Sequence, residues 1–170
     1  YDSSGIAVVG ANGAIAARKA AGKLDALVLS IGDALPVGKV GIGHTRWATH
    51  GAPNESNAHP LLDCLGEVVV VHNGIVENYV AMKRELLDQG HTFLSETDSE
   101  VIPHLIESLL GQGLSPEEAT RQAALRLGGA HAVVIMYSAE PEKLLAFRIG
   151  NGQFIPLVSS VVVVISSVSV

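Results

Sequence analysis

The sequence predicts an α+β domain, in which strands and helices form separate layers. Expected strands come in pairs, expected helices come in pairs, and 48% of the 170 residues are apolar. A doubly wound parallel sheet would instead require strands and helices to alternate strictly along the chain. A chain of this length is long enough to bury one sizeable core.

Charge and cysteine content narrow the functional classes. The net charge is -6 and the lysines and arginines form no cluster, which argues against nucleic-acid binding. The single cysteine cannot form an intrachain disulfide, so a reducing compartment is expected. No apolar run reaches the roughly 18 residues that a membrane span needs, and no signal peptide is recognisable. We therefore expect a soluble cytoplasmic domain.

The first expected elements are a hairpin, a short helix and two strands. Asn12-Gly13 separates two apolar runs, and both residues tolerate the positive φ that tight hairpin turns need. Residues 23–30 are expected to form a short helix, and residues 39–45 a strand. Residues 67–72 are expected to form the next strand, whose four consecutive valines suit burial on both faces.

Three helices are expected in the middle of the chain, over residues 78–89, 97–110 and 115–127. In the first, the apolar positions are Val80, Met82, Leu86 and Leu87. The second has the capping-box spacing Thr97-x-x-Glu100, in which both side chains satisfy free backbone N–H groups, and Pro103 is expected to kink it. The third has the N-cap Ser115 followed by Pro116 at the first helical position.

The end of the chain divides into a strand pair and a tail. Residues 131–137 and 143–148 are expected to pair as strands. Residues 157–170 are nearly all Val, Ser and Ile, which is the composition of an exposed β-aggregating segment. We therefore expect one domain over residues 1–150 and an irregular tail over residues 151–170, to which we assign no function.

Polar residues stand where expected strands end and where a helix begins. The planar guanidinium of Arg46 can hold a carboxylate bidentately, and a structural ion pair is the alternative. The Asn73 amide and the Gly74 N–H can form an oxyanion hole, and an ordinary turn is the alternative. Asp98 can cap a helix, bind a ligand ammonium, or do both.

Other candidate residues surround this set. Trp47 can form a wall or lid of a pocket, or belong to the core. Thr49 and His50 form a polar turn that can donate hydrogen bonds to a ligand. No metal site is predicted, because His44 and His50 lack metal-ligand spacing and no cysteine pair supports them. Cys64 has no cationic neighbour in the sequence that would lower its pKa, so we expect a structural role.

Five segments, in order, resemble the glutaminase domain of the class II glutamine amidotransferases, a family of N-terminal-nucleophile hydrolases. They are Tyr1-Asp-Ser-Ser-Gly5, Gly43-His-Thr-Arg-Trp-Ala-Thr-His-Gly51, Asn57-Ala-His-Pro60, Val71-His-Asn-Gly-Ile-Val-Glu-Asn78 and Ser95-Glu-Thr-Asp-Ser-Glu100. The resemblance extends from Tyr1 to about Gly150. The segment with the tryptophan is similar to the sugar-phosphate branch, whose members transfer ammonia to fructose 6-phosphate to make glucosamine 6-phosphate.

This resemblance implies a four-layer αββα sandwich that hydrolyses L-glutamine to glutamate and ammonia. It implies that Arg46, Thr49 and His50 bind the glutamine α-carboxylate. Asp98 would bind the α-ammonium, and Trp47 would belong to the loop that closes over the substrate. It also implies a sugar-phosphate isomerase domain in the parent protein, through which homo-oligomers can form.

The resemblance further implies that Asn73 and the Gly74 N–H form the oxyanion hole, with Gly74 also helping to hold the ammonium. The nucleophile of the family is an N-terminal cysteine whose own α-amino group acts as the base. Because Tyr1 already lies inside the family pattern, that cysteine is expected upstream of Tyr1. The residues from Tyr1 onward are then expected to release no glutamate by themselves. No cofactor is implied.

Three other interpretations stay open. The chain can be a truncated or degenerate module that holds glutamine without cleaving it. It can be the glutaminase domain of another class II amidotransferase. An unrelated structural α+β domain would have to carry the five segments in order without using them.

Overall fold

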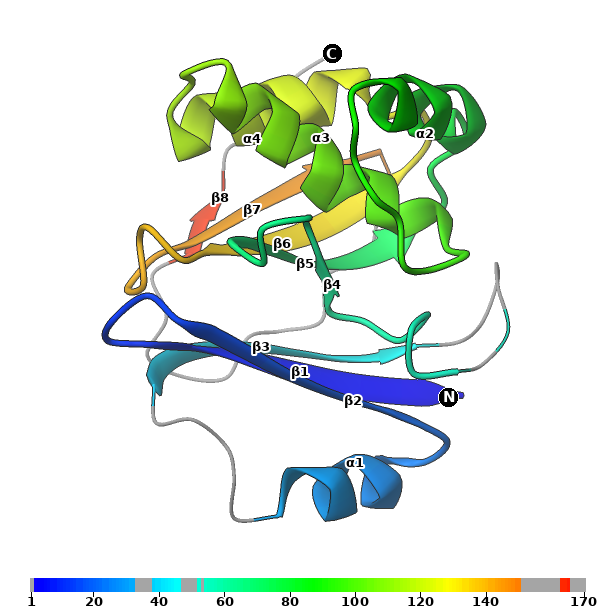
Figure 1. Cartoon of the computed structure of the whole chain (residues 1–170), viewed down its shortest axis with the longest axis vertical. Helices are drawn as coiled ribbons and strands as arrows, with labels where there is room; N and C mark the ends of the chain where they lie inside the picture. The colour runs from blue at the N-terminus through cyan, green and yellow to red at the C-terminus, as the bar shows by residue number, and fades with distance from the viewer. Residues whose placement is uncertain (1, 33–37, 47–51, 53, 151–162, 166–170) are drawn as a thin grey trace.

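Two stacked sheets form the centre of the structure, and helices cover both outer faces (Figure 1). The computed structural model describes residues 2–32, 38–46, 52, 54–150 and 163–165. From one side to the other, the layers are a helix, a three-stranded sheet, a five-stranded sheet and a layer of helices. The predicted α+β class and the αββα sandwich are confirmed.

The first sheet contains β1 (Ser3–Gly10), β2 (Ile15–Ala21) and β3 (Gly38–Arg46), with β1 in the middle and antiparallel to both neighbours. The predicted hairpin is β1–β2, and Gly13 in its turn has a φ of +79°, a region that glycine adopts without strain. Helix α1 (Leu24–Ile31), also predicted, lies on the outer face of this sheet (Figure 1).

The second sheet has the order β4-β5-β6-β7-β8. Its strands are β4 (Leu61–Leu62), β5 (Val68–Gly74), β6 (His131–Tyr137), β7 (Leu144–Ile149) and β8 (Val163–Ile165). The first four are antiparallel, and the predicted pairing of β6 with β7 is confirmed, whereas β8 runs parallel to β7. Strand β8 comes from the Val/Ser-rich tail, most of which lies outside the described residues.

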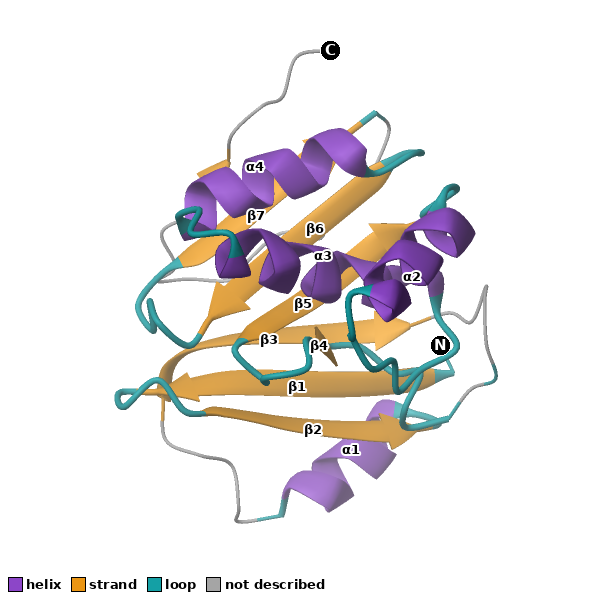
Figure 2. Ribbon diagram, turned by 45° about the horizontal axis from the view of Figure 1, so that its top comes forward, coloured by secondary structure: helices purple, strands orange, loops and turns teal. Residues whose placement is uncertain are grey.

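The helices α2 (Tyr79–Asp88), α3 (Val101–Gly111) and α4 (Pro116–Arg126) cover the outer face of the second sheet (Figure 2). A short 3₁₀ turn, η1 (Asp98–Glu100), leads directly into α3. Within the described part of the chain, no helix is long and apolar enough to cross a membrane.

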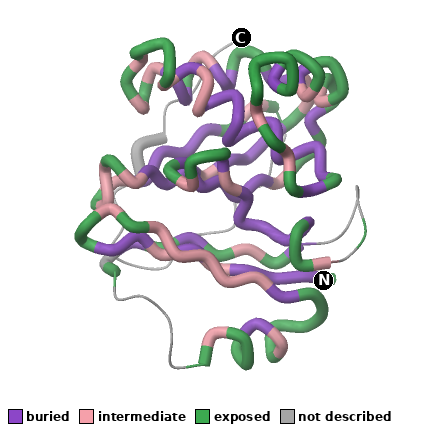
Figure 3. The backbone as a smooth tube through the Cα atoms, in the orientation of Figure 1, coloured by how far each residue is buried: buried purple, intermediate pink, exposed green. Residues whose placement is uncertain are grey.

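Strand β5 contributes to both hydrophobic cores. Successive strand side chains point to opposite faces, so Val68 and Val70 pack against the helices while Val69 and Val71 pack against the first sheet. All four are buried, as the run of valines predicted. Figure 3 shows the buried residues gathered along this sheet and on the helix surfaces that face it.

The start of the second predicted helix differs from the capping-box expectation. The Thr97 side chain makes no capping hydrogen bond. The Glu100 carboxylate instead accepts hydrogen bonds from the backbone N–H groups of Leu94 and Ser95, both at 2.7 Å. Glu100 therefore holds the preceding loop and does not close a reciprocal box, so that prediction is wrong.

The other helix predictions fare differently. Helix α3 continues through Pro103, because the proline lies in the first helical turn, where an N–H has no intrahelical partner to lose. The Ser115 cap is confirmed, since its Oγ accepts from the Glu118 N–H at 3.3 Å. In α2, Met82 is buried but Val80 is exposed, so the apolar positions do not all face the core.

Three buried histidines and one partly buried histidine form a row that links the two sheets. They are His44 in β3, His59 before β4, His72 in β5 and His131 in β6. The ring centroids are 4.6 Å apart for His44 and His59, 6.5 Å for His59 and His72, and 5.1 Å for His72 and His131. At this row the interface between the sheets is polar, and hydrogen bonds of the histidines partly compensate for the burial of their ring nitrogens.

Hydrogen bonds determine the tautomers at one end of this row. The Gly128 carbonyl can only accept, so Nε2 of His131 carries the proton of that 3.1 Å hydrogen bond. In a neutral ring, His131 Nδ1 then accepts from His72 Nε2 at 3.0 Å, and His72 Nδ1 accepts from the Ser99 hydroxyl at 2.7 Å. Burial, together with the neighbouring His131, lowers the pKa of His72 to about 3, so the ring is neutral.

We expect acid to destabilise the fold through this row. In the unfolded chain His72 takes up a proton near its ordinary pKa of about 6.5, whereas in the folded protein its pKa is about 3. The unfolded state therefore binds the extra proton between these values. The free energy of unfolding should fall by up to about 1.4 kcal/mol per pH unit for this one histidine.

Urea unfolding of the wild type and of His72→Gln between about pH 7.5 and about pH 5 measures this effect. The slope of the free energy of unfolding against pH is proportional to the number of protons taken up on unfolding. The variant is expected to lose stability more gradually as the pH falls. Identical slopes for the two proteins would show that His72 is not the responsible group.

Candidate functional site

Strands β3 and β5 end on the same side of the sandwich (Figure 1). Residues at these two strand ends help to line a cavity of about 240 Å³. Four predicted site residues line it: Arg46, Asn73, Gly74 and Asp98. The other three, Trp47, Thr49 and His50, lie outside the described residues. Pockets for drug-sized ligands start at about 300 Å³, so this cavity suits a smaller molecule.

Arg46 is the last residue of β3 and is only 6% exposed. It pairs with Ser3 of β1, and its carbonyl accepts from the Asp2 N–H at 2.8 Å. Burial lowers the pKa of the guanidinium, while the negative charges of Asp98 and Asp2 oppose this change. An arginine in such a setting stays charged, so it supplies a buried cation at the cavity.

Asp98 begins the η1 turn and is 3% exposed. Its Oδ2 accepts a hydrogen bond from the Val76 N–H at 2.7 Å. This bond ties the turn before α3 to the segment that follows β5. The carboxylate thus has a fixed position on the cavity wall and places a negative charge there.

His44 orients the side-chain amide of Asn73. The His44 Nε2 and the Asn73 Oδ1 are 2.8 Å apart, which makes the imidazole N–H the donor and the amide oxygen the acceptor. The amide NH₂ then points away from His44. Burial lowers the pKa of His44 in spite of the bond to Asn73, and the Arg46 charge lowers it further, so the ring is a neutral donor.

Gly74 occupies a position that no other residue fits. Its φ is +139°, and a Cβ there would lie 2.2 Å from the Ala130 carbonyl oxygen and 2.9 Å from His72 Nε2. A side chain would therefore displace the neighbouring backbone. The missing side chain lets the end of β5 pack closely against the chain before β6 and so fixes the backbone beside Asn73.

Sequence reasoning missed five other lining residues: His44, Thr45, His59, His72 and Ser99. A signal existed for His44, because residues two apart in a strand share a face and His44 precedes Arg46 by two. His72 and Ser99 adjoin the predicted Asn73 and Asp98. No local signal places His59, which reaches the cavity from the loop before β4.

Cys64 does not line this cavity. It lies in a second cavity with His91 and Glu107, beside α2 and α3. Burial raises the pKa of its thiol. This setting gives no support to Cys64 as an attacking nucleophile at the first cavity.

The sequence is similar to that of known amidotransferases. A family model described as "Glutamine amidotransferase domain" matches residues 44–161. Glutamine–fructose-6-phosphate aminotransferase [isomerizing] of Pyrococcus horikoshii is 52% identical over 148 residues, which are 87% of this chain and 25% of the relative. The protein of the same name from Aeropyrum pernix is 46% identical over 166 residues, 94% of this chain and 27% of the relative.

The solved structures that share this fold include an amidotransferase. Glutamine phosphoribosylpyrophosphate amidotransferase from B. subtilis, complexed with ADP and GMP, has a TM-score of 0.67 at 27% identity, over 81% of this chain and 29% of that chain. A structure described as the allosteric regulatory enzyme of purine biosynthesis has a TM-score of 0.68 at 28% identity, over 81% and 30%.

The matches cover most of this chain but only a small part of each relative. The chain spans about a quarter of the length of the curated relatives, so the similarity concerns one part of those proteins. Within this chain, the family match covers residues 44–161 and therefore includes every lining residue of the cavity. The chain belongs to the glutamine amidotransferase domain family.

Proposed function

We propose that this domain hydrolyses L-glutamine to glutamate and ammonia. The observation that carries the proposal is the joint placement of buried Arg46, buried Asp98 and the Asn73–Gly74 pair at one small cavity. In the parent protein the ammonia would pass to fructose 6-phosphate in a sugar-phosphate isomerase domain. This acceptor is supported by the names of the relatives and by the quarter of their length that the chain spans.

The charges of the cavity complement those of an amino acid. The Arg46 guanidinium would bind the α-carboxylate of glutamine with its planar pair of donors. Asp98 would bind the α-ammonium, with the Gly74 backbone contributing. Thr49 and His50 would add donors to the carboxylate, and Trp47 would close over the substrate.

The Asn73–Gly74 pair would act on the reacting amide. Attack on the side-chain carbonyl carbon of glutamine places a negative charge on the oxygen, which the Asn73 NH₂ and the Gly74 N–H would stabilise. His44 holds the Asn73 amide, and the glycine conformation holds the backbone. Both donors are therefore set before the charge develops, which is what makes such a site effective.

The pairing at the start of β1 supports a nucleophile upstream of Tyr1. Ser3 pairs with Arg46, and the Asp2 N–H is bonded to the Arg46 carbonyl, so a segment preceding Tyr1 would emerge beside the cavity. We infer that an N-terminal cysteine supplies the thiolate and its α-amino group supplies the base. The residues from Tyr1 onward would then release no glutamate by themselves.

A glutamine-binding module without catalysis is the alternative. Glutamate release by the full-length protein, with Met-Cys-Gly encoded before Tyr1, would support the enzyme. Glutamine binding without glutamate release, in a full-length protein with an intact cavity, would refute it in favour of the module. The cytoplasmic location and homo-oligomer formation through the isomerase domain stay predictions.

In the full-length protein, Asn73→Ala should lower kcat by about 10²–10³-fold, because it removes an oxyanion donor. His44→Ala should lower kcat by about 10-fold, because the amide remains but loses the hydrogen bond that orients it. Since His44 acts through Asn73, adding His44→Ala to Asn73→Ala should cost almost nothing further. Steady-state kinetics of both single variants and the double variant test this coupling, and additive losses would contradict it.

Substitution of either charged residue should weaken glutamine binding. Arg46→Ala should chiefly raise the KM for glutamine, because the lost contact binds the substrate equally well in the ground state and in the transition state. Asp98→Asn keeps an acceptor for the Val76 N–H and removes only the charge, so it should raise KM while the fold stays intact. Glutamate-release kinetics with circular dichroism as the folding control measure this, and an unchanged KM would disprove the assignment.

Cys64→Ser should leave the kcat and KM for glutamine unchanged in the full-length protein, because Cys64 lies in a different cavity. The assay is again glutamate release. A collapse of turnover in a folded variant would mean that Cys64 takes part in the chemistry.

A further inference from the structure

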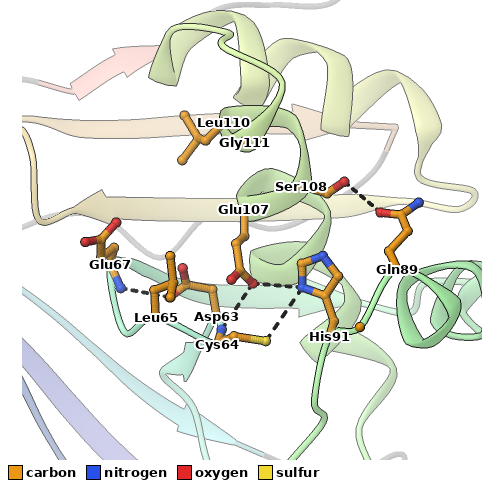
Figure 4. A pocket seen from close by; sticks show the side chains of 11 residues that line it. Asp63, Cys64, Leu65, Glu67, Gln89, His91, Glu107, Ser108, Leu110 and Gly111 are labelled. Carbon is orange, nitrogen blue, oxygen red and sulfur yellow. Dashed lines mark hydrogen bonds and ion pairs between the residues drawn. The ribbon is translucent and has the colours of Figure 1, made fainter.

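Four side chains of metal-ligating types converge outside the proposed glutamine site. Cys64 comes from the turn between β4 and β5, His91 from the loop after α2, and His104 and Glu107 from α3. One ligand atom from each lies within 4.8 Å of the other three. Figure 4 shows Cys64, His91 and Glu107 turned toward one another at the wall of a cavity of about 550 Å³.

The separations within this cluster suit one small ion. The Cys64 Sγ lies 3.6 Å from His91 Nδ1 and 3.5 Å from His104 Nδ1. The Glu107 Oε2 lies 2.8 Å from His91 Nδ1 and 3.3 Å from His104 Nδ1. A tetrahedral zinc with bonds of about 2.0–2.3 Å keeps its ligands roughly 3.3–3.7 Å apart. Of these four separations, only the Glu107–His91 contact would have to lengthen, by about half an ångström. The other two pairs of ligand atoms, His91–His104 and Cys64–Glu107, lie within 4.8 Å.

We propose that Cys64, His91, His104 and Glu107 form a tetrahedral zinc site. A thiolate with two imidazoles and one carboxylate is a donor set that zinc prefers, whereas magnesium and calcium prefer oxygen alone. Because the protein supplies all four ligands, no coordination position is left for water or substrate. The site would therefore be structural and not catalytic.

The surroundings hold the ligands in place. The Nε2 of His104 faces the Glu100 carboxylate at 3.6 Å, so the opposite ring nitrogen, Nδ1, is directed at Cys64. Glu100 is itself held by the Ser95 hydroxyl at 2.6 Å. Carboxylates of this kind, behind a ligating imidazole, orient the ring at many zinc sites. The Thr92 N–H lies 3.3 Å from the Cys64 sulfur and would stabilise a thiolate there.

Glu107 is suited to the role of an anionic ligand. Its Oε2 accepts a hydrogen bond from the Cys64 N–H at 3.1 Å, which holds the carboxylate beside the sulfur. The Cys64 thiol would release its proton to solvent on binding the ion. Thiolate and carboxylate together would then neutralise the two positive charges of zinc.

The proposed ion would connect three segments that are distant in sequence. Cys64 lies 27 residues before His91 and 43 residues before Glu107. A bound zinc would therefore link the β4–β5 turn and the loop after α2 to helix α3. Binding that occurs only in the folded state stabilises that state by mass action. A cluster held by hydrogen bonds alone is the alternative.

Cobalt substitution distinguishes a metal site from a cluster held by hydrogen bonds alone. The full-length protein is stripped with a chelator and titrated with Co²⁺, whose visible absorption is intense in a tetrahedral site and which shows a thiolate charge-transfer band in the near ultraviolet. We expect both signals at one equivalent of Co²⁺, and we expect Zn²⁺ to displace the ion. Zinc should also raise the Tm, whereas Mg²⁺ should not.

Variants assign the signals to the cluster. Cys64→Ser should abolish the charge-transfer band, and both Cys64→Ser and His91→Gln should weaken zinc binding by at least about 100-fold. Ser108→Ala is the matched control, because Ser108 lines the same cavity but its hydroxyl bonds only to Gln89 among the described contacts, and the variant should bind zinc like the wild type. Absence of the thiolate band in the wild type, or equal affinity in Cys64→Ser, would overturn the proposal. Because these measurements need no glutamine, they test the zinc site independently of the proposed hydrolysis.

Discussion

The burial of β5 on both faces is the constraint on which the rest of the structure depends. Its valines pack alternately against the helices and against the first sheet, so one strand serves two cores. A shift of one residue in its pairing with β6 would exchange the two faces, and the cost of that exchange fixes the register. Asn73 and Gly74 follow these valines directly, so hydrophobic packing determines where the two polar residues emerge.

The site beyond β5 combines two buried charges with a wall of neutral imidazoles. Burying Arg46 and Asp98 costs desolvation free energy, which their mutual attraction and the Val76 hydrogen bond offset in part. Protonated imidazoles next to Arg46 would add repulsion, and burial prevents this by lowering the pKa of His44 and of His72. The histidine row therefore supplies hydrogen bonds to the site without adding positive charge to it.

Local signals explain which parts of the structure the sequence could predict. The Asn12-Gly13 turn, the valine run of β5 and the Ser115 cap each depend on a few neighbouring residues, and all three were predicted. Glu100 had the right spacing for a capping box, but its carboxylate finds closer donors in the preceding loop.

In the site too, features that depend on neighbouring residues could be predicted, whereas features that depend on the folded chain could not. Arg46, Asn73, Gly74 and Asp98 stand at the ends of recognisable elements, so their chemistry could be predicted before their positions were known. His59 reaches the cavity through a loop, and its 3.2 Å hydrogen bond from the His72 N–H depends on the folded chain. Cys64 appeared isolated because its histidine neighbours are 27 and 40 residues away. Convergence of this kind is a property of the tertiary structure.

The start of α3 joins the two regions of the molecule that carry chemistry. Asp98 lines the cavity that we propose binds glutamine, Glu100 holds the loop before it, and His104 lies one helical turn beyond Glu100 and faces Cys64. These residues share one short, buried and continuous segment, so anything that orders α3 also orders the carboxylate at its start. The Val76 N–H and the Ser95 N–H already hold Asp98 and Glu100 in place, so a structural ion on the far side of Glu100 would add to the stability of the fold and leave the geometry of the proposed substrate site unchanged.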